Sequence, residues 1–393
     1  MSVAPSPELF RLCLVVGQLR VGGLERQVYL LASALDRRRF DVTVVSLGGE
    51  GSWSEGLSKA GVRVRHLRRR GHWDWRRLLG LARMLRSEHP HLAYSFNYET
   101  NAYTRLAGLL SSVPILVTGE RGVYMTRWQG FLERLLIRVT ECVICNAEAI
   151  RQDLIGRVRL PPHKLVTIPN AVEMPPPASP EERDTIRRAL RAGEDDCVVG
   201  TIARLDPIKN LPMMIEAAAV CTRTTPRLRF CVVGSGPEET GLRALIRERG
   251  LADSFFLLGE RVPAARFLSG FDVFVLTSWT EGLPNGVMEA MAASLPCVCT
   301  DVGGCRELVD PGRTGYLIPS GGVQALADRI LDLAGDPERR RSMGQAGRRR
   351  IEGGFSVRDL TSRTERILME LIAAKDSSPR GHRMAARCAE GGL

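Results

Sequence analysis

The chain has 393 residues, of which 44% are hydrophobic and 25% are charged, and its formal net charge is +11. This length is too great for one typical core and suits two domains. No apolar run reaches the roughly 18 residues that a membrane-spanning helix needs, and the first residues do not read as a signal peptide, so we expect a cytoplasmic protein.

The positive charge is concentrated in the first half. Residues 1–172 contain 25 Lys and Arg against 14 Asp and Glu, whereas residues 173–393 contain 30 of each kind. An Arg-rich run at 63–70 lies close to Trp73 and Trp75. Such a run is most often a solvated face, but basic residues beside tryptophan also suit an anionic membrane surface, peripheral to the inner face of a membrane. No recognised nucleic-acid motif accompanies the charge, and we expect no nucleic-acid partner.

The ten cysteines do not indicate a metal site. Several fall inside predicted strands, where reduced thiols act as small hydrophobic groups. Cys142 and Cys145 form a CxxC without a second pair or a histidine companion. We therefore expect both to lie in or beside a strand.

The first half alternates apolar strands with amphipathic helices, which is typical of a doubly wound α/β domain. Gly22 and Gly23 follow the first strand and precede a helix at 24–35, so the backbone there can approach a ligand closely, although a tight turn alone would also explain them. Strands are predicted at 9–16, 40–47, 61–67, 92–96, 115–118 and 143–145.

A proline-rich linker at 174–180 and a short helix at 181–191 lead to a second α/β unit. Its first strand, at 197–202, precedes a loop that contains Arg204 and Lys209. Two cations at the ends of such a loop can clamp a diphosphate, Arg204 as a bidentate fork and Lys209 as a point charge. The alternative is a pair of ordinary surface cations. Further strands are expected at 229–233 and 254–259.

The stretch 271–304 predicts a strand, a loop, a helix and a second strand. Asn285 can cap the helix, whose first turn offers free backbone amides to phosphate oxygens. Glu281 in the loop and Glu289 in the helix lie on either side of this possible phosphate site in the sequence. Carboxylates accept hydrogen bonds from sugar hydroxyls. A phosphate seat between two acids suits a sugar nucleotide, although the spacing alone is unspecific.

The letters around these acids carry a family resemblance. The run EGLPNGVMEAMA, followed by PCV and VGGCRE, closely resembles the signature of glycosyltransferase family 4, whose members have the two-domain GT-B fold. GGLE at 22–25, IPNAVE at 168–173 and ARLDPIKN at 203–210 resemble further family elements in the same order, with Ala171 and Glu173 in place of Gly and Asp. The resemblance covers roughly residues 9–373.

The resemblance implies an α/β chain with two Rossmann-like domains facing a cleft. The expected division is an acceptor domain at 1–172, a linker and edge helix at 173–196, a donor domain at 197–353, a crossover helix at 354–374 and a disordered tail at 375–393. Catalytic roles are implied for Arg204, Lys209 and Glu281. Donor binding is implied for Gly22, Gly23, Arg204, Lys209, Gly234, Leu283, Asn285, Gly286, Val287 and Glu289.

One position departs from the family pattern. Many relatives carry a histidine near the transferred sugar, after the strand that corresponds to 115–118, whereas this chain has Gly119, Glu120, Arg121 and Gly122. Glu120 or Arg121 faces the reaction centre in one interpretation, and pairs with other surface charges in the other.

We therefore expect a retaining glycosyltransferase that moves a sugar from a UDP- or GDP-sugar to an acceptor hydroxyl, on a lipid-linked or polysaccharide glycan. The two cations would neutralise the leaving diphosphate, so no metal and no further cofactor is expected. The alternatives are a GT-B epimerase or phosphorylase, a catalytically inactive sugar-nucleotide-binding protein, and a basic nucleic-acid-binding module.

Overall fold

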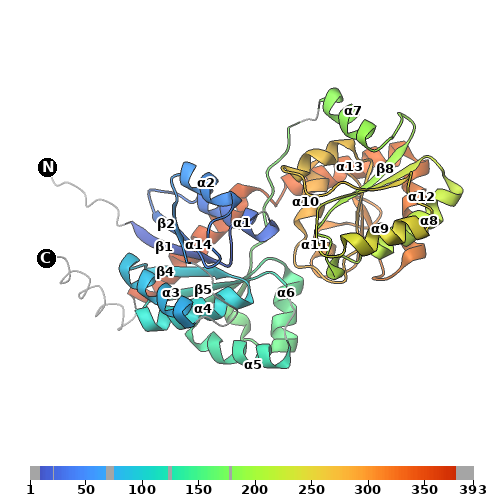
Figure 1. Cartoon of the computed structure of the whole chain (residues 1–393). Helices are drawn as coiled ribbons and strands as arrows, with labels where there is room; N and C mark the ends of the chain where they lie inside the picture. The colour runs from blue at the N-terminus through green and yellow to red at the C-terminus, as the bar shows by residue number, and fades with distance from the viewer. Residues whose placement is uncertain (1–8, 21, 68–74, 123–125, 177–178, 378–393) are drawn as a thin grey trace. The chain divides into compact units, whose positions relative to one another are not determined.

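The computed structural model describes residues 9–20, 22–67, 75–122, 126–176 and 179–377, and these residues form two compact units. One unit contains the chain up to Asn170 together with the segment from Val357 onward, and the other is Ala171–Ser356. Each unit has its own parallel sheet with helices on both faces, as Figure 1 shows. The predicted pair of Rossmann-like α/β units is confirmed.

The sheet of the amino-terminal unit has the strand order β3-β2-β1-β4-β5-β6-β7, and every pairing is parallel. Its central strands β4 and β5 are buried throughout and β1 is buried from its third residue on, as expected for mainly apolar strands between two helix layers. The strands are β1 (Phe10–Val16), β2 (Phe40–Ser46), β3 (Arg63–His66), β4 (Leu92–Phe96), β5 (Ile115–Glu120), β6 (Cys142–Cys145) and β7 (Leu165–Thr167).

Helices of this unit connect successive strands, and the last one returns from the far end of the chain. The amide of Asp36 donates to Glu365 Oε1 at 2.7 Å, which fixes α14 beside the end of α1. The helices are α1 (Gly23–Ala34), α2 (Ser52–Lys59), α3 (Trp75–Glu88), α4 (Tyr98–Ser111), α5 (Arg127–Leu136), α6 (Glu148–Asp153) and α14 (Val357–Asp376).

The sheet of the second unit has the order β10-β9-β8-β11-β12-β13, again with parallel pairings. The strands are β8 (Cys197–Ile202), β9 (Leu228–Val233), β10 (Phe255–Leu257), β11 (Val273–Leu276), β12 (Cys297–Thr300) and β13 (Gly315–Ile318). The helices are α7 (Pro180–Ala189), α8 (Leu211–Thr224), α9 (Glu239–Glu248), α10 (Asn285–Ala292), α11 (Cys305–Leu308), α12 (Val323–Gly335) and α13 (Pro337–Glu352).

The helix after the proline-rich segment belongs to the second unit. Arg183 and Arg187 of α7 each form an ion pair with Asp272, at 2.8 and 2.9 Å. Asp272 Oδ2 also accepts the amide hydrogen of Val198 at 2.8 Å, so the helix is tied to the start of β8. The unit therefore begins before the first predicted strand of the donor domain.

Two local predictions need correction. The strand β5 continues to Glu120, two residues beyond its predicted end, so Glu120 closes a strand and does not lie in a loop. The residue that precedes the first turn of α10 is Pro284, and no side chain caps this helix, so the prediction that Asn285 is the cap is wrong. Asn285 is instead the first helical residue. Residues 378–393 of the predicted tail lie outside the described residues, as do Arg68, Arg69, Arg70 and Trp73.

Candidate active site

The loops that follow β8 and β11 meet at the carboxyl edge of the second sheet, which is where open parallel sheets bind ligands. The hydroxyl of Thr277 donates to the carbonyl oxygen of Lys209 at 2.8 Å, and the amide of Trp279 donates to the carbonyl oxygen of Ile208 at 2.9 Å. These two bonds hold the predicted cation loop against the predicted acid loop.

Lys209 and Glu281 form an ion pair at this edge. Lys209 Nζ lies 2.6 Å from Glu281 Oε1, and the hydroxyl of Ser278 donates to the same oxygen at 2.6 Å. The side chains are 24% and 12% exposed, so both are partly desolvated and still reachable from solvent. The sequence predicted both residues as members of one site but did not predict that they bind each other.

Arg204 lies on the same loop, and its side chain is more exposed to solvent than that of Lys209. Its guanidinium forms an ion pair with Asp206 and is 74% exposed. Asp206 is only 18% exposed, whereas solvent reaches the guanidinium of Arg204. An anion at this edge can therefore reach the guanidinium fork directly.

Gly234 and Gly303 allow neighbouring loops to approach this edge closely. Gly234 has φ +147°, and a Cβ there would lie 2.0 Å from the carbonyl oxygen of Ala203. Gly303 has φ +50°, and a Cβ there would lie 1.9 Å from the carbonyl oxygen of Glu281. Both positions require glycine for backbone packing. The sequence indicated a donor role for Gly234, and that role stays a prediction.

The start of α10 lies at the same edge, directly after the acid loop. Leu283 and Val287 are buried and anchor the turn, while Asn285, Gly286 and Glu289 are half-buried. A Cβ at Gly286 would lie 3.3 Å from the ring of Phe274 and 3.4 Å from the carbonyl oxygen of Ile202, so this residue sits over the ends of β8 and β11. The first amides of the helix present its positive end at this edge.

Gly22 and Gly23 lie at the start of α1 in the other unit. Gly22 is the residue before the first turn, and its backbone is extended. A Cβ there would lie 2.2 Å from Glu25 Oε2, so a larger residue would displace that buried carboxylate. This contact gives Gly22 a packing role, and donor binding by the glycine pair stays a prediction.

Glu120 lies in a buried polar cluster of the amino-terminal unit. Its side chain is 3% exposed, and Glu120 Oε1 accepts a hydrogen bond from Asn101 Nδ2 at 2.7 Å. Burial, reinforced by the nearby charge of Glu133, raises the pKa of Glu120 to about 8. Glu120 does not face solvent in this conformation, and its predicted catalytic role stays a prediction.

Arg121 turns away from that cluster. Its guanidinium donates to Asn170 Oδ1 and lies 5.4 Å from the centre of the Phe96 ring. Burial lowers the pKa of Arg121. The partners are thus an amide, the Tyr94 side chain and an aromatic ring, whereas the sequence suggested the reaction centre or surface charges.

Sequence reasoning missed the centre of the buried cluster. Arg105 on α4 and Glu133 on α5 form an ion pair at 2.7 Å, and the two side chains are 0% and 1% exposed. Arg105 also donates to the hydroxyls of Thr140 and Thr118, at 2.9 and 3.3 Å. The available signal was Asn101 and Arg105, two polar residues four positions apart and therefore on one helix face.

The described cysteines are free and buried, as predicted, and Cys142 and Cys145 lie on β6. Burial raises the pKa of Cys142 to about 12. Among the described residues, no cluster of three or more histidine, cysteine or acidic side chains could hold a metal ion.

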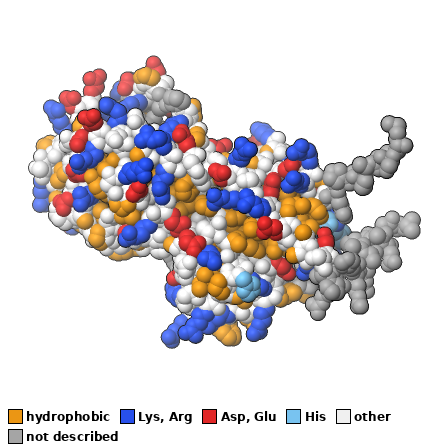
Figure 2. Space-filling model, turned by 180° about the vertical axis from the view of Figure 1, so that it is seen from behind, with side chains coloured by type: hydrophobic (Ala, Val, Ile, Leu, Met, Phe, Trp, Pro, Cys, Tyr) orange, Lys and Arg blue, Asp and Glu red, His pale blue; other side chains and the backbone are white. Residues whose placement is uncertain are grey.

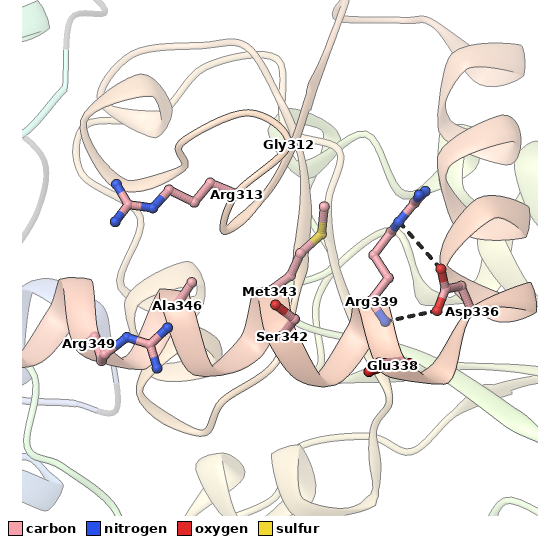
Figure 3. A pocket seen from close by; sticks show the side chains of 9 residues that line it. All are labelled: Gly312, Arg313, Asp336, Glu338, Arg339, Ser342, Met343, Ala346 and Arg349. Carbon is pink, nitrogen blue, oxygen red and sulfur yellow. Dashed lines mark hydrogen bonds and ion pairs between the residues drawn. The ribbon is translucent and has the colours of Figure 1, made fainter.

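A separate hollow of about 590 Å³ opens between the loop before β13 and the helix α13 (Figure 3). Because this loop leads into β13, the hollow lies toward the amino ends of the strands, away from the candidate site. Figure 3 shows Arg339 turned toward Asp336, while Arg349 lies farther along the helix and Arg313 comes from the loop before β13. We assign it no part in the candidate site.

Two Rossmann-like units in one chain, with Arg204, Lys209 and the start of α10 at the carboxyl edge of the second sheet, are the architecture of the GT-B fold. Residues 21–174 match the family described as Glycosyltransferase Family 4, and residues 182–350 match Glycosyl transferases group 1. The chain belongs to glycosyltransferase family 4, and the resemblance seen in the sequence is confirmed.

Curated relatives match parts of the chain. The alpha-D-kanosaminyltransferase of Streptomyces kanamyceticus is 30% identical over 262 residues, which are 62% of this chain and 67% of that protein. The UDP-Gal:alpha-D-GlcNAc-diphosphoundecaprenol alpha-1,3-galactosyltransferase of Escherichia coli is 24% identical over 77% of this chain and 81% of its own length. EpsD of Bacillus subtilis is 33% identical over 58% of this chain and 61% of its length. These three matches span about three fifths to about four fifths of the relatives' own lengths.

Solved structures share the whole fold. The crystal structure of Anabaena HepE in complex with UDP-glucose superposes with a TM-score of 0.82 at 21% identity, and the match covers 91% of this chain and 99% of HepE. The structure of TarM superposes with a TM-score of 0.76 at 13% identity, over 94% of this chain and 99% of TarM.

Proposed function

We propose that the protein transfers a sugar, with retention, from a nucleoside diphosphate sugar to a hydroxyl group of a glycan acceptor. The observation that carries this proposal is the meeting of Lys209, Glu281 and the start of α10 at one sheet edge, with Arg204 on the adjoining loop. Cations and helix amides suit a diphosphate, and the carboxylate suits sugar hydroxyls.

Charge stabilisation of the leaving diphosphate would supply most of the catalysis. Lys209 has three ammonium hydrogens, so it can keep one on Glu281 and direct another at a phosphate oxygen. The exposed guanidinium of Arg204 would exchange Asp206 for the diphosphate and bind it with two parallel hydrogen bonds. Neutralisation by these two side chains requires no metal, and metal independence is part of the proposal.

Glu281 and Glu289 would each bind a different part of the donor. Glu281 would hold the sugar directly, or the phosphate region through the ammonium that it shares with Lys209, because it belongs to the loop at the end of β11. Glu289 would accept hydrogen bonds from the ribose hydroxyls, one turn into α10. The names of two curated relatives, one from Escherichia coli and one from Corynebacterium glutamicum, specify UDP-Gal and GDP-mannose respectively, so both nucleotides are candidates.

The proposed acceptor is a lipid-linked or membrane-presented glycan, met at an anionic cytoplasmic surface. The excess positive charge of residues 1–172 supports this proposal. So does the relative from Escherichia coli, whose name includes a diphosphoundecaprenol-linked sugar. In the part of the chain that the structure describes, no helix is both long enough and apolar enough to cross a bilayer.

A donor screen tests the reaction class. The melting temperature of the full chain would be measured with UDP- and GDP-sugars, because a ligand that binds the folded state raises it by mass action. The donor that stabilises most would then be incubated with lipid-linked acceptors, and transfer of the sugar is expected. Epimerised donor, a need for free phosphate, or tight binding without turnover on any acceptor would contradict the proposal.

A further inference from the structure

The helix α5 carries its large apolar side chains on the solvent side. Trp128, Phe131 and Leu135 are 68%, 51% and 48% exposed, and the rings of Trp128 and Phe131 stack with their centres 5.6 Å apart. Residues spaced by three and four along a helix share one face, and in a soluble domain such an apolar face normally packs on the core.

The opposite face of α5 is the one that contacts the unit. Gly130, Glu133 and Leu136 are buried, and Glu133 is bound to buried Arg105 of α4. At the amino end, the hydroxyl of Thr126 accepts the amide hydrogen of Gln129, and the Gln129 side chain accepts the amide hydrogen of Thr126 in return. The orientation of the helix is therefore fixed, and its apolar ridge cannot turn inward.

The exposed face is also basic. Arg127 and Arg134 of α5, and Arg138 in the turn that follows it, are exposed, while the only acid of the helix, Glu133, is withdrawn into the core. Figure 2 shows blue and orange side chains together at the lower edge of the amino-terminal unit, where α5 lies in Figure 1. A solvated helix face would instead mix both signs of charge and few large apolar groups.

We propose that this face of α5 docks on an anionic lipid surface, with its apolar ridge at the level of the head groups and its arginines on lipid phosphates. Tryptophan and phenylalanine beside basic residues suit that interface. A second copy of the chain fits less well, because a two-fold contact would bring the same arginines together without acids. The inference rests on the proposed membrane-presented acceptor and specifies the docking surface.

Flotation of the full chain with vesicles tests this assignment. The vesicles would be phosphatidylcholine alone or mixed with phosphatidylglycerol, each at low and moderate salt. One variant combines Trp128→Ser with Phe131→Ser. The matched control is Trp75→Ser on α3, since Trp75 is 65% exposed and belongs to the other candidate surface, near the Arg-rich run.

A further variant changes Arg127, Arg134 and Arg138 to Gln together. We expect its binding to anionic vesicles to fall about fivefold per arginine, since each basic group near such a surface contributes about 1 kcal/mol. The apolar double variant should bind at least tenfold more weakly, while Trp75→Ser should bind as the unaltered chain does. Wild-type binding should require the anionic lipid and weaken with salt.

Several outcomes would overturn the assignment. The first is that the wild-type protein does not float with anionic vesicles even at low salt. The second is that it binds equally to both kinds of vesicle. The third is that Trp75→Ser loses vesicle binding while the α5 variants keep it. A concentration-dependent dimer that the α5 variants abolish, without vesicle binding, would assign the face to a second copy. Thermal shift with the best donor is measured in each variant. If the donor raises the melting temperature of a variant as much as it does for the wild-type protein, the variant still binds donor. A loss of vesicle binding in that variant then concerns the docking surface and not the proposed transfer reaction.

Discussion

Replacing Lys209 by Met should reduce turnover far more than it reduces stability. In the unliganded protein the change removes an ion pair with an N–O distance of 2.6 Å, but Glu281 keeps the hydrogen bond from Ser278. With side chains 24% and 12% exposed, the carboxylate also gains water, so we expect the free energy of unfolding to fall by about 1–2 kcal/mol.

The loss of transition-state stabilisation should be larger. Removing one cation from a desolvated anion contact costs about 2–5 kcal/mol, which corresponds to roughly 30-fold to 5,000-fold in rate. Arg204→Met should fall in the same kinetic range. Its stability should fall by about 1–2 kcal/mol, because the guanidinium is 74% exposed but Asp206, which loses its ion-pair partner, is only 18% exposed.

The assay measures kcat/KM for the donor at saturating acceptor, together with urea unfolding of the unliganded protein. The control is Lys59→Met, since Lys59 Nζ also lies 2.6 Å from a carboxylate, that of Glu55, but both side chains are about three-quarters exposed. It should leave turnover and stability unchanged. Turnover within threefold of normal in both Lys209→Met and Arg204→Met would refute the reasoning. A fall in rate that is fully explained by a smaller fraction of folded protein would refute it as well.

Three further predictions concern the acids and a glycine. Glu289→Gln should weaken the donor and the free nucleotide together, whereas Glu281→Gln should reduce transfer more than binding of the bare nucleotide; calorimetry with both ligands and rate measurements decide, and identical profiles would contradict the division of roles. Because burial raises the pKa of Glu120 to about 8 in the folded state, the protonated form is favoured by folding. Stability should therefore fall as pH rises from about 4.5 to about 8, and Glu120→Gln should remove this fall, by up to about 4 kcal/mol at pH 8; unfolding midpoints at pH 5 and 8.5 test it, and an unchanged slope in the variant would oppose it. Gly303→Ala should lower stability by roughly 1–3 kcal/mol and weaken donor binding, since its Cβ would meet the carbonyl oxygen of Glu281; a fully stable variant with normal donor affinity would argue against this packing role.

The alternation of apolar strands and amphipathic helices was enough to predict both parallel sheets. Buried parallel strands are mainly apolar runs, so β1, β8 and β11 could be predicted from the sequence. The edge that carries Lys209 and Glu281 followed from the order of the motifs, because the loops after parallel strands share one edge of the sheet.

Contacts between side chains could not be read in the same way. The ion pair between Lys209 and Glu281 joins residues 72 positions apart, and the pair between Arg105 and Glu133 joins residues on different helices. The burial of Glu120 depends on β5 continuing past Thr118, and strand ends are set by pairing with β6 more than by local letters. The exposed ridge of α5 has the spacing of a core face, so its direction required the structure.

The pairing of Lys209 with Glu281 bears on which ligands the site selects. A lone lysine would hold any polyphosphate, because it offers only charge. A carboxylate that shares the ammonium repels a bare phosphate and accepts hydrogen bonds from hydroxyl groups. The pair therefore favours a ligand whose hydroxyls lie beside its phosphate, as in a nucleoside diphosphate sugar. On this argument Glu281→Gln should retain or even strengthen binding of the bare nucleoside diphosphate while it loses discrimination for the sugar-bearing donor.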